Sequence, residues 1–169
     1  MSNHIVFIFG QANTGKKTLI KLIKDADPSE AGASLADRIN RMILNDMQFV
    51  TWDLSDLFVL KDIWDKESEN IKILLFLLDT SDQDRFSEVK KKFYHVIFEL
   101  DSKNRPLVFC FHKMDLEDAE KNYVKARDLF ELQKITKNKV YKLQTSINNP
   151  EDIDLLRNQL VEIIESSRW

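Results

Sequence analysis

The chain has 169 residues, and only three of them are glycine and three proline. Its 43% hydrophobic and 31% charged residues are typical of an ordinary soluble globular domain, and its length suits one hydrophobic core rather than two. We therefore expect a single domain over residues 1–169. The near balance of 25 basic and 28 acidic residues, a formal net charge of −3, argues against a nucleic-acid partner, which would normally require a basic face.

The first and last residues and the cysteine usage bear on location. The first apolar run, Ile5–Phe9, is too short to span a membrane and lacks the basic start of a signal peptide. Ser2 stands where a myristoylation signal needs glycine, and the last residues form no prenylation box. Cys110 is alone, so no internal disulfide can form, which favours a reducing compartment. The sequence predicts a cytoplasmic protein without an intrinsic membrane anchor.

Strand-like and helical segments alternate along the chain. Strands are expected at Ile5–Phe9, Met47–Trp52, Ile71–Leu78, Leu107–Phe111 and Val140–Leu143. Helices are expected at about Lys16–Lys24, Phe86–Leu100, Ala119–Gln133 and Ile153–Ile164, the last of them starting near Asn149-Pro150-Glu151.

This alternation predicts an α/β fold, a three-layer sandwich with a mostly parallel, six-stranded sheet. Apart from Lys72, Ile71–Leu78 and Leu107–Phe111 are continuously apolar, which is typical of strands buried on both faces of a parallel sheet. Arg38–Leu44 and Met47–Trp52 flank Asn45-Asp46, so we expect them to form the one antiparallel hairpin. In such sheets ligands bind at the carboxyl ends of the strands.

The segment after the first expected strand has the G-x4-G-K pattern of a phosphate-binding loop, from Gly10 to Lys16. Gly10 and Gly15 let backbone N–H groups turn toward phosphate oxygens, and Lys16 supplies positive charge at the β/γ end. The helix that follows adds its N-terminal partial charge. An ordinary β–α turn is the alternative. The other residues expected to contact the nucleotide here are Asn13, Thr14, Lys17 and Thr18.

The last element of this motif is missing, because Lys17 stands where a serine or threonine hydroxyl would bind Mg²⁺. An ammonium cannot ligate a cation and would repel one. Thr18 lies one residue later, about 100° around the helix, and cannot simply take over. Lys17 is expected instead to replace part of the charge of the metal, giving nucleotide binding with little Mg²⁺ dependence.

A second group of candidate residues follows the strand that ends near Trp52. Asp53 occupies the place of an aspartate that commonly supports the Mg²⁺ shell. Ser55 and Asp56 stand where a glycine would approach the γ-phosphate, and the Asp56 carboxylate would repel that phosphate. Leu57 stands where a water-positioning glutamine is expected and cannot orient a nucleophile. A polar loop with a helix cap is the alternative.

A base-reading element follows the fourth expected strand, at His112-Lys113-Met114-Asp115, which resembles N/T-K-x-D. Asp115 would accept hydrogen bonds from the N1–H and 2-amino groups of guanine, and the Lys113 stem would cover the base and ribose. His112 replaces the usual asparagine. A helix start capped by Asp115 is the alternative. The last strand is followed by Thr145-Ser146-Ile147, in the place of the element whose backbone contacts the guanine oxygen.

In order and spacing, these four elements resemble a small GTPase over essentially the whole chain. Trp52-Asp53 is similar to the Arf and Rag branches, and His112 is similar to the Rag branch in particular. The resemblance implies the P-loop NTPase fold and GDP or GTP as the ligand. It also implies that Ser34 stands at the switch I threonine, which makes Ser34 and Asp53 the candidate Mg²⁺ residues. Protein partners would bind around Ser34 and from Asp53 to Trp64.

The departures from the pattern, at Lys17, Ser55, Asp56 and Leu57, all fall at the metal and γ-phosphate end, whereas the base-reading end is nearly intact. We expect a guanine-nucleotide-binding switch protein with slow or absent hydrolysis. The alternative is a nucleotide-free pseudo-GTPase scaffold, in which Lys17 fills the phosphate pocket or pairs with Asp53 or Asp56. An active GTPase or another P-loop kinase is a third hypothesis, although no arginine-rich lid supports a kinase.

Overall fold

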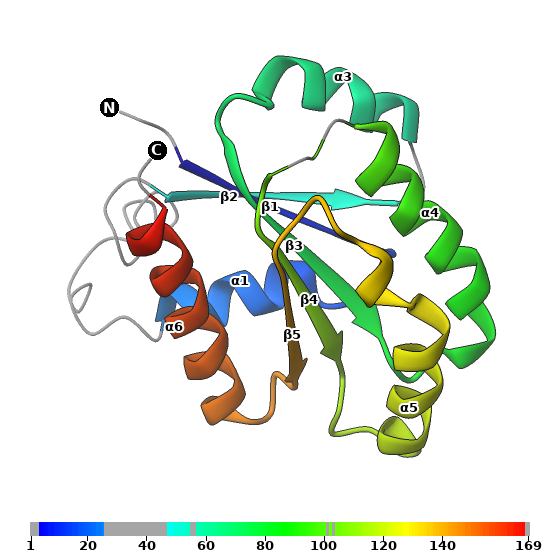
Figure 1. Cartoon of the computed structure of the whole chain (residues 1–169). Helices are drawn as coiled ribbons and strands as arrows, with labels where there is room; N and C mark the ends of the chain where they lie inside the picture. Colours follow the sequence, from blue (N-terminus) through cyan, green and yellow to red (C-terminus); the bar gives the residue numbers. More distant parts are fainter. Residues whose placement is uncertain (1–3, 26–46, 55–56, 101, 103, 168–169) are drawn as a thin grey trace.

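Five strands, all paired in parallel, form the centre of the computed structural model, which describes residues 4–25, 47–54, 57–100, 102 and 104–167 (Figure 1). The strands are β1 (His4–Gly10), β2 (Met47–Asp53), β3 (Ile71–Asp79), β4 (Leu107–His112) and β5 (Val140–Thr145). The helices are α1 (Lys16–Asp25), α3 (Leu57–Glu67), α4 (Phe86–Glu99), α5 (Ala119–Phe130) and α6 (Pro150–Ser166), with short 3₁₀ turns η2 (Gln83–Arg85) and η3 (Leu132–Lys134).

The five expected strands and the four expected helices are confirmed to within a few residues, and the α/β class is confirmed with them. The Asn149 side chain caps α6 by accepting from the Glu151 N–H at 3.2 Å, directly before Pro150. The expected sixth strand, Arg38–Leu44, and its hairpin lie outside the described residues.

Helix α3 was not expected from the sequence. Among the side chains of α3 whose burial is described, Leu60 and Trp64 are exposed by less than 5%, and they are four residues apart on one face. The Trp64 ring packs edge-on against Phe7, with centroids 6.0 Å apart, and the Arg105 guanidinium lies 5.0 Å from the same ring. This contact with the core holds the helix on the sheet.

The sheet has the strand order β2-β1-β3-β4-β5, so the chain reverses its direction of travel across the sheet at β1. Such a reversal opens a crevice at the carboxyl ends of the strands. The strand register brings these ends together: Gly10 pairs with Asp53, Asp79 with His112, and His112 with Thr145. The motif residues at the strand ends therefore lie along one edge of the sheet.

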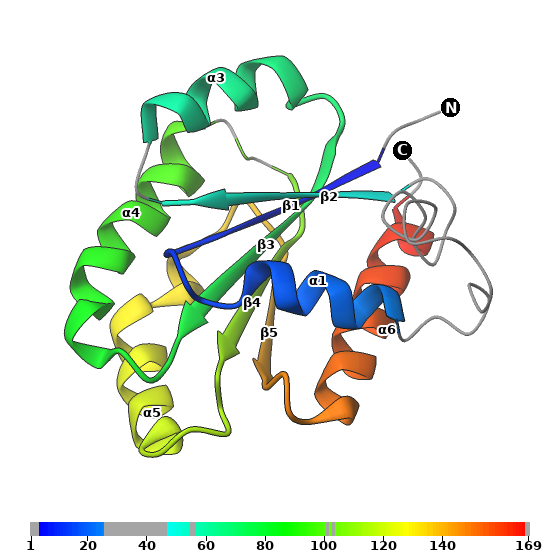
Figure 2. The ribbon, with the colours of Figure 1, turned by 180° about the vertical axis from the view of Figure 1, so that it is seen from behind.

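Helices cover both faces of the sheet, with α1 and α6 on one side and α3, α4 and α5 on the other (Figures 1 and 2). Alternate strand residues point to the two sides, which gives two apolar layers. One layer holds Ile8 and Leu75 with helix residues such as Leu19. The other is rich in aromatic rings, such as Phe76 and Phe93, whose centroids are 4.7 Å apart. Burial on both faces confirms the expectation drawn from the continuous apolar runs.

No helix in the described ranges is both long enough and apolar enough to cross a membrane.

Candidate nucleotide-binding site

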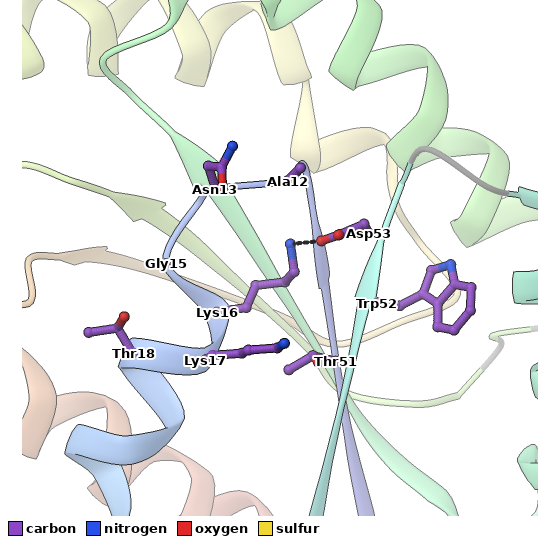
Figure 3. A pocket seen from close by; sticks show the side chains of 9 residues that line it. All are labelled: Ala12, Asn13, Gly15, Lys16, Lys17, Thr18, Thr51, Trp52 and Asp53. Atoms are coloured by element: carbon purple, nitrogen blue, oxygen red, sulfur yellow. Dashed lines mark ion pairs between the residues drawn. The ribbon is translucent and has the colours of Figure 1, made fainter.

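A cavity of about 800 Å³ lies at the carboxyl ends of β1 and β2, next to the start of α1 (Figure 3). It is lined by Ala12, Asn13, Gly15, Lys16, Lys17, Thr18, Thr51, Trp52 and Asp53. The structure thus places the residues expected from the phosphate-loop motif beside Asp53, which the sequence separates from them by more than thirty positions.

The backbone of the loop requires glycine at both motif positions. A Cβ atom on Gly10 would lie 2.6 Å from the Leu77 carbonyl oxygen of β3, closer than real Cβ atoms approach. Gly15 has a φ of +93°, which side chains rarely allow, and a Cβ there would lie 3.3 Å from His112 Nε2. The buried Thr14 hydroxyl donates to the Gln11 carbonyl at 3.0 Å and closes the turn.

The Lys16 ammonium is enclosed by the loop. Its side chain is 7% exposed, and Nζ donates to the carbonyls of Gly10 at 3.2 Å and Gln11 at 2.5 Å. Nζ also forms an ion pair with Asp53 Oδ1, drawn as the dashed line in Figure 3. The partner that the scaffold hypothesis assigned to Lys17 is therefore held by Lys16, and Asp56 lies outside the described residues.

The next two residues of α1 differ in direction. The Lys17 side chain is exposed and extends along the cavity toward Thr51, whereas the Thr18 side chain extends from the opposite side of α1 (Figure 3). This agrees with the separation of consecutive residues around a helix. Of the two candidate metal residues, Asp53 ends β2, and Ser34 lies outside the described residues.

The Asp115 carboxylate is held by the segment after β5. Oδ1 accepts from Ser146 Oγ at 2.6 Å, and Oδ2 accepts from Asn148 Nδ2 at 2.7 Å. These two hydrogen bonds, the one from Ser146 first, lower the pKa of Asp115 below its ordinary value, so the group is ionised at neutral pH. The helix-cap alternative for Asp115 is wrong, because α5 begins at Ala119 with Asp118 as its N-cap.

His112 joins three parts of the site. Its ring is 1% exposed, Nδ1 lies 2.7 Å from the Thr145 hydroxyl, and Nε2 packs against Gly15 of the phosphate loop. Burial, and secondly the nearby Lys113 charge, lower the pKa of His112 to about 4, so the imidazole is neutral at pH 7. His112 therefore lies between the phosphate loop, at Gly15, and the end of β5, at Thr145.

Lys113 links the base-reading segment to the phosphate loop. Its ammonium donates to the Asn13 carbonyl at 3.0 Å and pairs with Asp79 Oδ2 at 2.6 Å. The backbone of Lys113 has a φ of 63°, in the left-handed region, which turns the chain out of β4. Ile147, the last residue of the expected base-contacting element, is 40% exposed beside the buried Ser146.

Two residues of this network, Asp79 and Asn148, were missed by the sequence reasoning. Asp79 had a usable signal, because it directly follows the apolar run of β3 at the strand end where ligands bind. Asn148 had none beyond its position two residues after Ser146.

A phosphate loop after β1, a carboxylate after β4 and a doubly wound parallel sheet define a small-GTPase type of domain. Residues 1–164 of the chain match the ADP-ribosylation factor family. The chain therefore belongs to the ADP-ribosylation factor (Arf) family.

Individual relatives are similar at low identity. The chain is 25% identical to the small COPII coat GTPase SAR1 of Giardia intestinalis over 115 residues, 68% of this chain and 60% of that protein. It is 21% identical to human ADP-ribosylation factor-like protein 5A over 116 residues, 69% and 65% of the two chains. It is 24% identical to mouse ADP-ribosylation factor-like protein 14 over 169 residues, 96% and 86%. The first two alignments span less than two thirds of the relatives' length.

These matches confirm the Arf part of the expected resemblance. The Rag-like character of His112 stays a prediction.

Proposed function

We propose that this chain is a guanine-nucleotide-binding switch protein that hydrolyses GTP slowly or not at all. The observation that carries the proposal is the hydrogen bond from the Lys113 ammonium to the Asn13 carbonyl of the phosphate loop. Lys113 is two residues before Asp115 in the sequence. This bond fixes the phosphate end of the site relative to the base-reading carboxylate, as a nucleotide that spans both requires. GDP and GTP are the ligands that fit the two ends.

Guanine selectivity is assigned to Asp115. An ionised carboxylate offers about four acceptor positions, and Ser146 and Asn148 use one on each oxygen. The remaining positions suit the N1–H and 2-amino donors of guanine. Adenine lacks this pair of donors, so the site would discriminate against it.

Slow or absent hydrolysis is inferred from Leu57, the first residue of α3. Its half-buried side chain packs against the aromatic core layer and carries no atom that could orient a water molecule. The other departures expected at the γ-phosphate, Ser55 and Asp56, lie outside the described residues.

Protein partners are proposed to bind the segment from Asp53 to Trp64 and the segment around Ser34. Within the first, Trp64 is 4% exposed and belongs to the core, so it would act by holding α3 in place. Val59, on the same helix, is 44% exposed. We further propose a single domain over residues 1–169 and a cytoplasmic location.

The alternative function, a scaffold that binds no nucleotide, is favoured by one observation. The Lys16 ammonium already has Asp53 and two carbonyls as partners. Nucleotide content separates the two functions. In the first assay, purified protein is denatured and any released nucleotide is identified by chromatography. In the second, folded protein freed of nucleotide is titrated with fluorescent GDP and GTP, with ADP and ATP as competitors.

We expect the protein to release guanine nucleotide or to bind it with a micromolar dissociation constant. Lys16→Ala should lose this binding, and the matched variant Lys21→Ala should keep it. Lys21 is an exposed lysine on the same helix, outside the cavity lining. Absence of any bound or titratable guanine nucleotide would leave the scaffold as the function.

A further inference from the structure

Resting on the proposed function, we propose that Lys17 takes the place of the divalent cation, so that this chain binds the diphosphate of a guanine nucleotide without Mg²⁺. The residues described in the structure do not fit a magnesium ion, and they do fit a phosphate group.

The first step concerns the ligands a magnesium ion would need. Mg²⁺ requires near-octahedral oxygen donors at close range. At the hydroxyl position of the motif the structure has the Lys17 ammonium, which has no lone pair to donate. The neighbouring hydroxyl of Thr18 extends to the other side of α1 (Figure 3).

The second step concerns Asp53, the one candidate metal carboxylate within the described residues. Its Oδ1 is paired with the Lys16 ammonium. A cation beside this carboxylate would lie close to that ammonium and across the cavity from a second one, on Lys17. Two like charges around one carboxylate oppose a divalent cation.

The third step concerns what Lys17 can do instead. Its exposed side chain lines the same cavity as the phosphate loop and extends along it toward Thr51. Among the described residues it makes no ion pair, in contrast to Lys16. Its charge is therefore available to a phosphate, and it adds to the partial positive charge at the N-terminus of α1.

The two lysines then have separate tasks. Lys16 is enclosed, with its position fixed by Gly10 and Gln11 carbonyls, and would meet the phosphate nearest the loop. Lys17 would meet the outer side of the same diphosphate, where the motif normally places the metal. A lysine there supplies fixed positive charge in the place of a bound ion.

The test compares the dissociation constant of fluorescent GDP in excess EDTA with that in millimolar Mg²⁺, using purified full-length protein freed of nucleotide. For the unmodified chain we expect the two constants to agree within about threefold. For Lys17→Thr we expect binding in EDTA to weaken about tenfold or more, with recovery on adding Mg²⁺. Lys17→Arg should behave like the unmodified chain, because it keeps the charge.

Lys21→Thr is the matched control, since it removes the same charge from the same helix outside the cavity, and it should change neither constant. The inference is overturned if the unmodified chain binds GDP only with Mg²⁺, a result that leaves the proposed function standing and needs no variant. It is also overturned if Lys17→Thr binds GDP as well as the unmodified chain in EDTA. Failure to bind GDP in either buffer refutes the proposed function itself.

Discussion

Replacing Asp115 with asparagine tests whether this carboxylate reads the base. In the structure, Oδ1 and Oδ2 each accept one hydrogen bond, from Ser146 and Asn148, which leaves acceptor positions for two guanine donors. A hydrogen bond to a charged group is worth about 1.5–3 kcal/mol. Asparagine keeps one acceptor, loses the charge and turns an NH₂ donor toward the guanine amino group. The combined loss of about 3 kcal/mol or more corresponds to a GDP affinity about a hundredfold weaker.

The same substitution should create affinity for xanthosine diphosphate. Xanthine carries a carbonyl oxygen where guanine carries the 2-amino group, so the new NH₂ finds an acceptor. The assay is competition of GDP and xanthosine diphosphate against fluorescent GDP or its xanthine analogue, for the unmodified chain and the variant. Asp118→Asn is the matched control, because this exposed acid stands at the N-cap position of α5, makes no capping hydrogen bond with its side chain, and has a left-handed backbone conformation that asparagine tolerates.

We expect the ratio of the two affinities to reverse in Asp115→Asn and to stay unchanged in Asp118→Asn. Equal GDP binding by the unmodified chain and Asp115→Asn, with no gain for the xanthine nucleotide, would show that Asp115 does not face the base.

Three further predictions concern the framework of the site. Gly15→Ala should lower the free energy of unfolding by about 1–2 kcal/mol, because of its φ of +93° and the approach to His112; an unchanged urea midpoint would contradict this. Because burial lowers the pKa of His112 from 6.5 to about 4, the unfolded chain binds more protons between these values, and the unfolding free energy should fall by up to about 3 kcal/mol as pH drops from 6.5 to 4. When the free energy of unfolding, measured with urea, is plotted against pH, the slope should be shallower for His112→Asn than for the unmodified chain, and equal slopes would refute the assignment. Cys110 is fully buried, which raises its thiol pKa, so a thiol reagent should label it only at the rate of unfolding; fast labelling of the folded chain would disprove this.

The sequence predicted the parallel sheet and the phosphate loop because both depend on short-range patterns. The run Leu107–Phe111 is apolar at every position and Ile71–Leu78 at every position except Lys72, which is typical of strands buried on both faces. Gly10 and Gly15 are two of only three glycines, and their spacing is visible in the sequence alone. Gly15 is required locally by its φ of +93°, whereas Gly10 is required by the close approach of the Leu77 carbonyl of β3.

The contacts within the site could not be predicted in the same way, because they join residues far apart in the chain. Lys113 and Asp79 are 34 positions apart and meet only through the pairing of β3 with β4. Asn148 and Asp115 are 33 positions apart, and their bond depends on the shape of the loop after β5. Lys16 and Lys17 are consecutive residues in the first turn of α1, so their side chains point in different directions. It is the direction of Lys16 that brings its ammonium to Asp53.

These long-range contacts explain how the two ends of the site can differ so much in their match to the GTPase pattern. Two contacts join the base-reading segment to the phosphate loop: the Lys113 ammonium donates to the Asn13 carbonyl, and the His112 ring lies beside Gly15. Neither contact involves Lys17 or Asp53, so we expect substitutions at the metal end to leave the base-reading end in place. Substitutions at Lys113 or His112, in contrast, would remove a contact that the phosphate loop makes with the base-reading end. We therefore expect a substitution confined to the metal end, such as one at Lys17, to change the Mg²⁺ dependence of nucleotide binding without abolishing that binding.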